Sequence, residues 1–160
     1  MRSKSPIFLL GMSLMVRSLE TRVEAAPPVV AAGGSFVCTP KMVWDGEGPV
    51  WCAEGPRLRI SGIAAREMDG SCRSNQPCPP ASAESARNAL VRLLGGSGGR
   101  TPDGHVLVAG PRLSFLSDGS AGGSRTAAWC TGPGVGDLSC RMVATGTVLR
   151  WDRFWRRHAC

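Results

Sequence analysis

Arginine is the residue type whose number and chemistry most clearly point to a ligand. The chain has a net charge of +7, and beyond residue 25 fourteen of its cationic residues are arginines while Lys41 is the single lysine. A planar guanidinium group presents paired N–H donors that match two oxygens of one phosphate, whereas the ammonium group of lysine acts as a point charge. The composition is therefore compatible with a polyanionic partner, but a high-GC genome also raises the arginine content, so the charge alone does not decide between the two.

Cysteine is the second residue type with its own chemistry. Seven cysteines in 160 residues indicate a disulfide framework formed in an oxidising compartment. The sequence holds no C-x-x-C pair, and His105 and His158 stand apart, so the spacing typical of a zinc site is missing. The spacing does not fix the connectivity. The pairing that we expect is Cys38–Cys52, Cys72–Cys78 and Cys130–Cys140, with Cys160 left over.

The N-terminal segment is typical of a signal peptide. Arg2 and Lys4 precede an apolar run at residues 6–16, and small residues around Ala25 resemble a cleavage site. The apolar run is well short of the roughly 20 residues that cross a bilayer as a helix. We therefore expect residues 1–25 to be removed on export, a secreted or periplasmic location, no stable membrane insertion after cleavage, and a mature net charge of about +5.

The rest of the chain has the length of one domain. Residues 26–35 are small and uncharged, with Pro and Gly, and predict a flexible lead-in. Residues 36–160 are within the size of a single hydrophobic core. We expect one domain that is a monomer.

The expected elements are mostly short strands. The apolar runs Phe36–Trp44 and Pro49–Ala53 flank an Asp45-Gly46 turn, which is a strong hairpin signal. The other expected elements are strands at Arg57–Ile63, His105–Ala109 and Arg125–Cys130, a loop at Glu67–Pro80, a main helix at Ala81–Leu94 and a short helix at Leu138–Thr145. This order predicts a mainly β, α+β protein: a five-stranded Greek-key barrel of the OB-fold type with one main helix and a short second helix.

Four motifs in this order resemble the thermonuclease, or staphylococcal-nuclease-like, family. The family carries a D-G-[DE] turn, a segment R-x-x-G-I-D-x-P-E, a helix, and a G-R element on a late strand. The matching parts here are Asp45-Gly46-Glu47, the segment Arg59-Ile60-Ser61-Gly62-Ile63-Ala64-Ala65-Arg66-Glu67, the helix Ala81–Leu94, and Gly123-Ser124-Arg125. The resemblance spans about residues 36–150 and implies an OB-fold nuclease that hydrolyses phosphodiester bonds of DNA or RNA.

The resemblance also implies a role for each matching residue. Arg59 and Arg125 would clamp the phosphate from opposite sides of the barrel, and Glu67 would act as the general base or orient the attacking water. Glu47 would be a ligand of a calcium ion that bridges phosphate and protein.

The chain departs from the family at the calcium site. Ala64 stands where the family has Asp, and Arg66 stands where it has Pro. Calcium takes about six to eight oxygen ligands, several of them from carboxylates. We therefore expect weak calcium binding and impaired hydrolysis unless Asp45 or Asp69 joins the site.

Two other function classes remain open. A non-catalytic OB-fold module would bind nucleic acid or another polyanion without cleaving it, and a disulfide-stapled envelope protein would use the same charges only as a salt-bridge network. Convergence of Arg59, Glu67 and Arg125 on one pocket with Glu47 would favour the nuclease. Convergence without a carboxylate pair would favour the binding module, and scatter of these residues would favour the envelope protein.

Three further segments carry expectations. His105 is expected at the surface, and Ser117–Ser124 is expected to form a flexible hairpin rather than a phosphate cradle. The tail Arg150–Cys160 interleaves arginines with aromatic residues, which either dock a terminal helix on the core, the interpretation that we favour, or stack on nucleobases.

Overall fold

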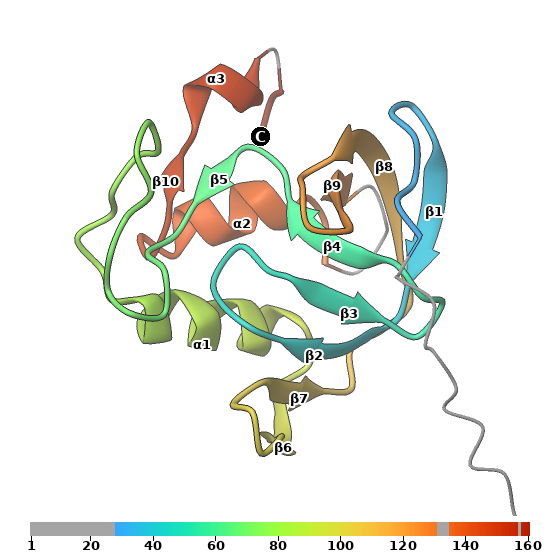
Figure 1. Cartoon of the computed structure of the whole chain (residues 1–160), viewed down its shortest axis with the longest axis horizontal. Coiled ribbons are helices and arrows are strands. Elements are labelled where there is room, and N and C mark those ends of the chain that lie inside the picture. The colour runs from blue at the N-terminus through green and yellow to red at the C-terminus, as the bar shows by residue number, and fades with distance from the viewer. Residues whose placement is uncertain (1–27, 131–134, 157) are drawn as a thin grey trace, which may run out of the picture.

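A computed structural model describes residues 28–130, 135–156 and 158–160. The fold is mainly β, with one curled sheet of eight strands, a second sheet of two strands and three short helices (Figure 1). The elements are β1 (Ser35–Cys38), β2 (Pro40–Val43), β3 (Val50–Cys52), β4 (Arg57–Ile60), β5 (Ile63–Ala64), α1 (Ala83–Leu93), β6 (Ser97–Arg100), β7 (Val106–Val108), β8 (Leu113–Ser120), β9 (Arg125–Cys130), α2 (Leu138–Ala144), β10 (Leu149–Arg150) and α3 (Asp152–Trp155).

The large sheet has the order β1-β8-β9-β4-β3-β2-β7-β6. Its pairs are antiparallel except for β4 and β9, which run parallel. β1 and β2 are separated only by Thr39, yet β1 pairs with β8 while β2 pairs with β3 and β7. The sheet therefore curls, because one continuous stretch of chain belongs to both of its sides.

The predicted hairpin at the Asp45-Gly46 turn is confirmed. β2 and β3 are antiparallel neighbours, with Val43 opposite Val50. Asp45 holds the turn, because its Oδ1 accepts hydrogen bonds from the backbone N–H groups of Glu47 and Gly48, each at 2.9 Å. Such a side-chain bond to the following backbone is the reason why Asp favours turns.

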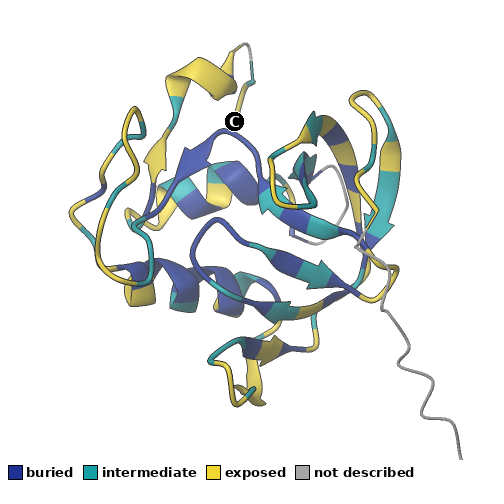
Figure 2. Ribbon diagram, in the orientation of Figure 1, coloured by how far each residue is buried: buried dark blue, intermediate teal, exposed yellow. Residues whose placement is uncertain are grey.

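The main helices are confirmed and cover the sheet. The helix predicted at Ala81–Leu94 is α1, capped by the hydroxyl of Ser82, and the one predicted at Leu138–Thr145 is α2, capped by Asp137. Figure 2 shows the inner faces of both helices buried against the sheet. The core between them holds the largest buried side chains: Phe115, Leu58, Ile60, Ile63, Leu90, Leu94, Leu113, Leu138, Met142, Val43, Val50 and Val148.

After residue 60 some of the strands differ from those predicted. The strand predicted at Arg57–Ile63 is split into β4 and β5, which belong to different sheets. The strand predicted at His105–Ala109 is confirmed as β7, which pairs with β2 and β6. The neighbour of β9 is β8, which the sequence analysis missed because Asp118 and Gly119 read as a loop. Its alternating burial nevertheless follows the period of two of a half-buried strand.

Two of the predicted disulfides are confirmed and the third was wrong. Cys38–Cys52 and Cys72–Cys78 are bonded, but Cys140 pairs with Cys160. Cys130 ends β9 as a thiol 3 % exposed within the core. The chain after α3 returns to α2 and brings Cys160 to Cys140.

The N-terminal expectations fall largely outside the described residues. The predicted signal peptide, residues 1–25, lies there in full. Within the part of the chain that the structure describes, no helix is both long and apolar enough to cross a membrane. Residues 28–34, in the expected lead-in, contact the sheet: Val30 N–H donates to Thr126 Oγ1 at 3.0 Å and Gly33 N–H donates to the carbonyl of Ser117 at 2.8 Å.

Candidate phosphate-binding site

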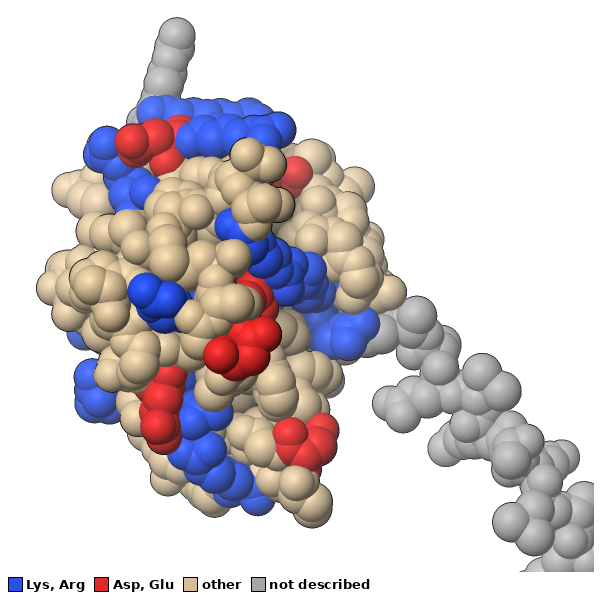
Figure 3. All heavy atoms as spheres, turned by 60° about the vertical axis from the view of Figure 1, so that its left-hand side comes forward, with Lys and Arg blue, Asp and Glu red and all other residues tan. Residues whose placement is uncertain are grey.

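Two adjoining cavities share Arg73 and Arg125. The larger, about 730 Å³, is also lined by Arg59 and by the aromatic residues Trp151 and Phe154. The smaller, about 370 Å³, is lined by Trp44, Asp45, Pro49, Trp51, Arg57, Glu67, His105 and Gly123 as well. The predicted residues Arg59, Glu67 and Arg125 therefore converge on one connected region. Figure 3 shows basic and acidic atoms side by side across the middle of one face of the molecule.

Glu47 lies behind the cavities rather than in them. Its side chain is 6 % exposed, and its Oε1 accepts a hydrogen bond from Arg59 Nη2 at 2.7 Å. Oε2 accepts from the backbone N–H of Ala65 at 3.0 Å. Burial raises the pKa of Glu47, while Arg59 opposes that rise. The carboxylate is thus a buried support that fixes the direction of the Arg59 guanidinium.

Asp45 is a second buried carboxyl beside it. Burial raises the pKa of Asp45 to about 7, and the nearby charge of Glu47 adds to the rise. The two backbone N–H groups that it accepts from in the turn work against that rise, since they stabilise the ionised form. The D-G-E turn therefore places one buried carboxyl group, Glu47, against Arg59 and a second, Asp45, in the wall of the smaller cavity.

Glu67 is held by an arginine that the sequence analysis did not select. Arg73 Nε lies 2.6 Å from Glu67 Oε1, and Arg73 Nη2 donates to Oε2 at 3.2 Å. Arg66, which precedes Glu67 in the sequence, donates instead to the carbonyls of Pro79 and Gly70. The loop closed by the Cys72–Cys78 disulfide brings Arg73 to the site, and the one sequence signal for it was its place next to Cys72.

Arg125 reaches both cavities, and the hydrogen bonds that its guanidinium makes to the described residues go to carbonyl groups. Its Nε donates to the carbonyl of Gly122 at 3.0 Å and its Nη2 to that of Ala121 at 3.2 Å. Burial lowers the pKa of Arg125, and the charges of Arg73 and Arg59 lower it further. An anion placed between the three guanidinium groups would relieve this repulsion.

The resemblance implied that Arg59 and Arg125 lie on opposite sides of the barrel, but they do not. They stand on the neighbouring parallel strands β4 and β9, where Arg59 is opposite Ala127 and Arg125 is opposite Arg57. The two guanidinium groups therefore approach the cavity from the same wall of the sheet, two positions apart along the register.

Aromatic residues of the C-terminal tail form part of the wall of the larger cavity. The tail docks on the core, as expected, through Trp155, whose ring meets Trp129 edge to face at 5.6 Å. Trp151 and Phe154 remain in the larger cavity, and the Arg59 guanidinium lies 5.5 Å from the centre of a Trp151 ring.

His105 was expected at the surface, and this was wrong. Its side chain is 12 % exposed and packs against Trp44 and Trp51, with ring centres 4.9 and 4.3 Å away. His105 is buried because it packs against a tryptophan from each arm of one hairpin, which a single histidine in a sequence does not reveal.

The residues at this site do not fit a calcium ion. Both oxygens of Glu47 already accept hydrogen bonds, and the positive charge of Arg59 lies against one of them. Ala64, where the family has Asp, is fully buried in β5, and Asp69 caps the backbone of Ser71 in an exposed turn. Within the described ranges, Asp45, Glu47 and Glu67 do not bring three ligand atoms within 4.8 Å of one another.

Comparison with known proteins identifies no relative of this chain. No family model, no curated protein and no solved structure matches the chain.

Proposed function

We propose that this protein binds the phosphodiester backbone of single-stranded nucleic acid in the larger cavity. The observation that carries the proposal is that Arg59, Arg73 and Arg125 all line that cavity, with Arg125 bonded to neutral carbonyl groups. A guanidinium group in this state keeps its charge and its remaining N–H donors for an anion, and charge-assisted bonds to phosphate are among the strongest hydrogen bonds that proteins make.

Single strands fit the cavity better than a duplex. Trp151 and Phe154 lie beside the arginines, and Phe154 is 40 % exposed. Stacking on an aromatic ring requires an unstacked base, which a single strand provides and a duplex does not. Phosphate contacts would hold the backbone while the rings take bases of any sequence.

The strand order supports a five-stranded OB-fold barrel as the scaffold. If β1 and β2 count as one bent strand, the order β1/β2, β3, β4, β9, β8 returns to β1. β6 and β7 then form an added hairpin on the outside of β2. OB folds commonly bind oligonucleotides on such a barrel, which agrees with the resemblance to thermonucleases.

Hydrolysis is the second candidate, and Glu67 is the observation that favours it. This carboxylate lines the smaller cavity together with Arg125, so a phosphate between them would have a base and an electrophile in reach. Glu67 must first leave Arg73, because both of its oxygens are occupied. Binding without rapid cleavage is therefore the function that we place first.

Export is part of the proposal. The signal-like segment and the three disulfides agree with an extracellular or periplasmic protein that meets nucleic acid outside the cytoplasm.

The test is a titration of a fluorescent oligothymidylate followed by anisotropy. Arg125→Ala should weaken binding about 10- to 100-fold, the size of a charged hydrogen bond, whereas Arg112→Ala should leave it unchanged because Arg112 is exposed outside the cavities. Equal losses in both variants would indicate a diffuse basic surface and overturn the proposal. Gel analysis of the same oligonucleotide, with calcium or a chelator, then decides whether it is also cut.

A further inference from the structure

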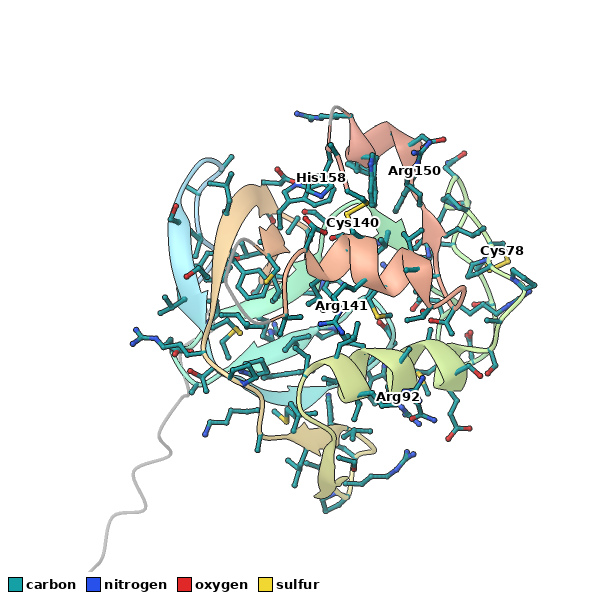
Figure 4. All side chains as sticks on the ribbon, turned by 180° about the vertical axis from the view of Figure 1, so that it is seen from behind. Cys78, Arg92, Cys140, Arg141, Arg150 and His158 are labelled. Atoms are coloured by element: carbon teal, nitrogen blue, oxygen red, sulfur yellow. A yellow bond between two sulfur atoms is a disulfide. The ribbon has the colours of Figure 1, made fainter. Side chains whose placement is uncertain are left out.

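We propose that the reduced form of this protein binds a zinc ion through Asp137, Cys140, His158 and Cys160. These residues lie at the start of α2 and at the end of the chain, on the far side of the molecule from the view of Figure 1. Figure 4 shows Cys140 and His158 next to each other at that place, with the sulfur of Cys140 directed to the C-terminal segment. The inference is independent of the proposed nucleic-acid function.

Three of the four donor atoms are already gathered, those of Asp137, Cys140 and His158. His158 Nε2 lies 2.7 Å from Asp137 Oδ2 and 3.8 Å from Cys140 Sγ. The Sγ atoms of Cys140 and Cys160 are bonded to each other. Among the described residues, Asp137, Cys140 and His158 are the one group of three such residues whose ligand atoms lie within 4.8 Å of one another.

The protein holds two of the ligands in place by separate contacts. Asp137 Oδ1 accepts the N–H of Cys140 at 2.7 Å, which caps α2 and turns Oδ2 toward His158. The His158 ring stacks on Trp129 with ring centres 3.8 Å apart, and Trp155 Nε1–H donates to the His158 carbonyl at 2.8 Å. These contacts hold the His158 ring and its backbone in place beside Asp137 and Cys140.

The donor set and its dimensions suit zinc once the disulfide is reduced. Zinc prefers four ligands from thiolate, imidazole and carboxylate groups in a tetrahedron, with bonds of about 2.0–2.3 Å. Such bonds separate neighbouring donor atoms by about 3.3–3.8 Å. The imidazole and the Cys140 sulfur already have this separation, whereas the imidazole and the Asp137 carboxylate must move apart from 2.7 Å and the two sulfur atoms must separate. With side chains 22 % and 25 % exposed, His158 and Asp137 leave the site open to solvent.

The redox state decides whether the site exists. A dithiol reductant transfers two electrons to the Cys140–Cys160 bond and becomes a disulfide itself, which yields two thiolates for zinc. In the reverse direction, a small disulfide accepts two electrons from the thiolates, the protein disulfide forms, and the zinc ion leaves. In the oxidised protein only Asp137 and His158 remain as ligands, and two ligands bind zinc weakly. Zinc and disulfide would thus alternate in holding the C-terminal segment on α2.

The experiment measures zinc affinity of the full chain by competition with a chromophoric chelator, after reduction with a phosphine. Reduced wild type should bind one zinc ion at least about a hundredfold tighter than Cys140→Ser/Cys160→Ser treated in the same way, because that variant lacks both thiolates. Cys72→Ser/Cys78→Ser is the matched control, since it removes another short disulfide loop and should keep the affinity of wild type.

A second measurement distinguishes zinc bound at this folded site from zinc bound by the cysteines of an unfolded chain. Cobalt bound to the reduced wild type should show thiolate-to-metal absorption and a tetrahedral spectrum, and His158→Ala should lower the affinity at least about tenfold. Equal zinc affinity in reduced wild type and in Cys140→Ser/Cys160→Ser would overturn the proposal. Unchanged affinity in His158→Ala, or equal affinity in oxidised and reduced wild type, would overturn it as well.

Discussion

Two Arg–Glu pairs border the same pair of cavities, and they differ in burial rather than in distance. Arg59 and Glu47 lie 2.7 Å apart with side chains 13 % and 6 % exposed, whereas Arg73 and Glu67 lie 2.6 Å apart at 55 % and 20 %. A buried pair cannot lose one partner without leaving an uncompensated charge. An exposed pair is worth about 0–1 kcal/mol and can exchange partners. The buried pair therefore builds the site, and the exposed pair is the one that a ligand can open.

The largest effect should come from the buried pair. Glu47→Gln keeps a carbonyl oxygen for the N–H of Ala65 but leaves the Arg59 guanidinium without its carboxylate. We expect a loss of about 3–5 kcal/mol in the free energy of unfolding, measured with urea at neutral pH.

The matched variant is Glu67→Gln, which removes the carboxylate from the exposed pair. We expect a change of at most about 1 kcal/mol there. Similar losses in the two variants would mean that burial does not separate the pairs, and the comparison would fail.

The second effect concerns the pH dependence that the buried acids impose. The folded-state pKa of Asp45 is about 7, above its ordinary value of 3.8, so between these pH values the folded protein holds a proton that the unfolded chain has lost. The stability that Asp45 contributes is therefore present below about pH 4 and is lost as pH rises through about 7.

Asp45→Asn should remove this loss, because the amide oxygen can still accept the turn hydrogen bonds and carries no charge. The variant should gain on the order of 3 kcal/mol over wild type between pH 4 and pH 8, measured as the difference in unfolding free energy at each pH. A difference that stays constant across this range would contradict a raised pKa.

The sequence predicted the parts of the fold that local signals specify. The Asp45-Gly46 turn and the helices around Ala86 and Met142 have such signals in their turn residues, caps and apolar spacing. β8 was missed because Asp118 and Gly119 favour turns by type, while pairing with β1 and β9 overrides that preference.

The site was predictable only where a motif marks it. The resemblance selected Arg59, Glu67 and Arg125, and these converge on the connected cavities. Arg73 belongs to no motif, and it reaches the site because a disulfide loop folds back from Glu67. The cluster at His158 was excluded on spacing, since its ligands lie in two segments that only the folded chain brings together.

The third effect is the reverse of the first: it should be large in ligand binding and small in the free energy of unfolding. Arg73→Ala should weaken oligonucleotide binding about tenfold, less than a full charged hydrogen bond because Arg73 must first give up Glu67. Its unfolding free energy should change by no more than about 1 kcal/mol. Anisotropy titration and urea unfolding of one preparation of Arg73→Ala measure its binding and its stability. A variant that is destabilised but binds normally would mean that the Arg73–Glu67 pair supports the fold rather than the ligand.

The smallest effect is a gain in binding affinity on removal of a charged side chain. Glu67 competes with phosphate for Arg73 through two contacts and also repels an anion by its own charge. Glu67→Gln should therefore tighten binding of the oligothymidylate about two- to fivefold, corresponding to the roughly 0.5–1 kcal/mol of an exposed pair. If Glu67 is also the base of a slow hydrolysis, the same variant should abolish cleavage while it tightens binding, whereas weaker binding would show that Glu67 supports the ligand instead of competing with it. Glu84→Gln is the control for removal of one negative charge, because Glu84 is an exposed residue of α1 that pairs with Arg87 and Arg100 and lines neither cavity.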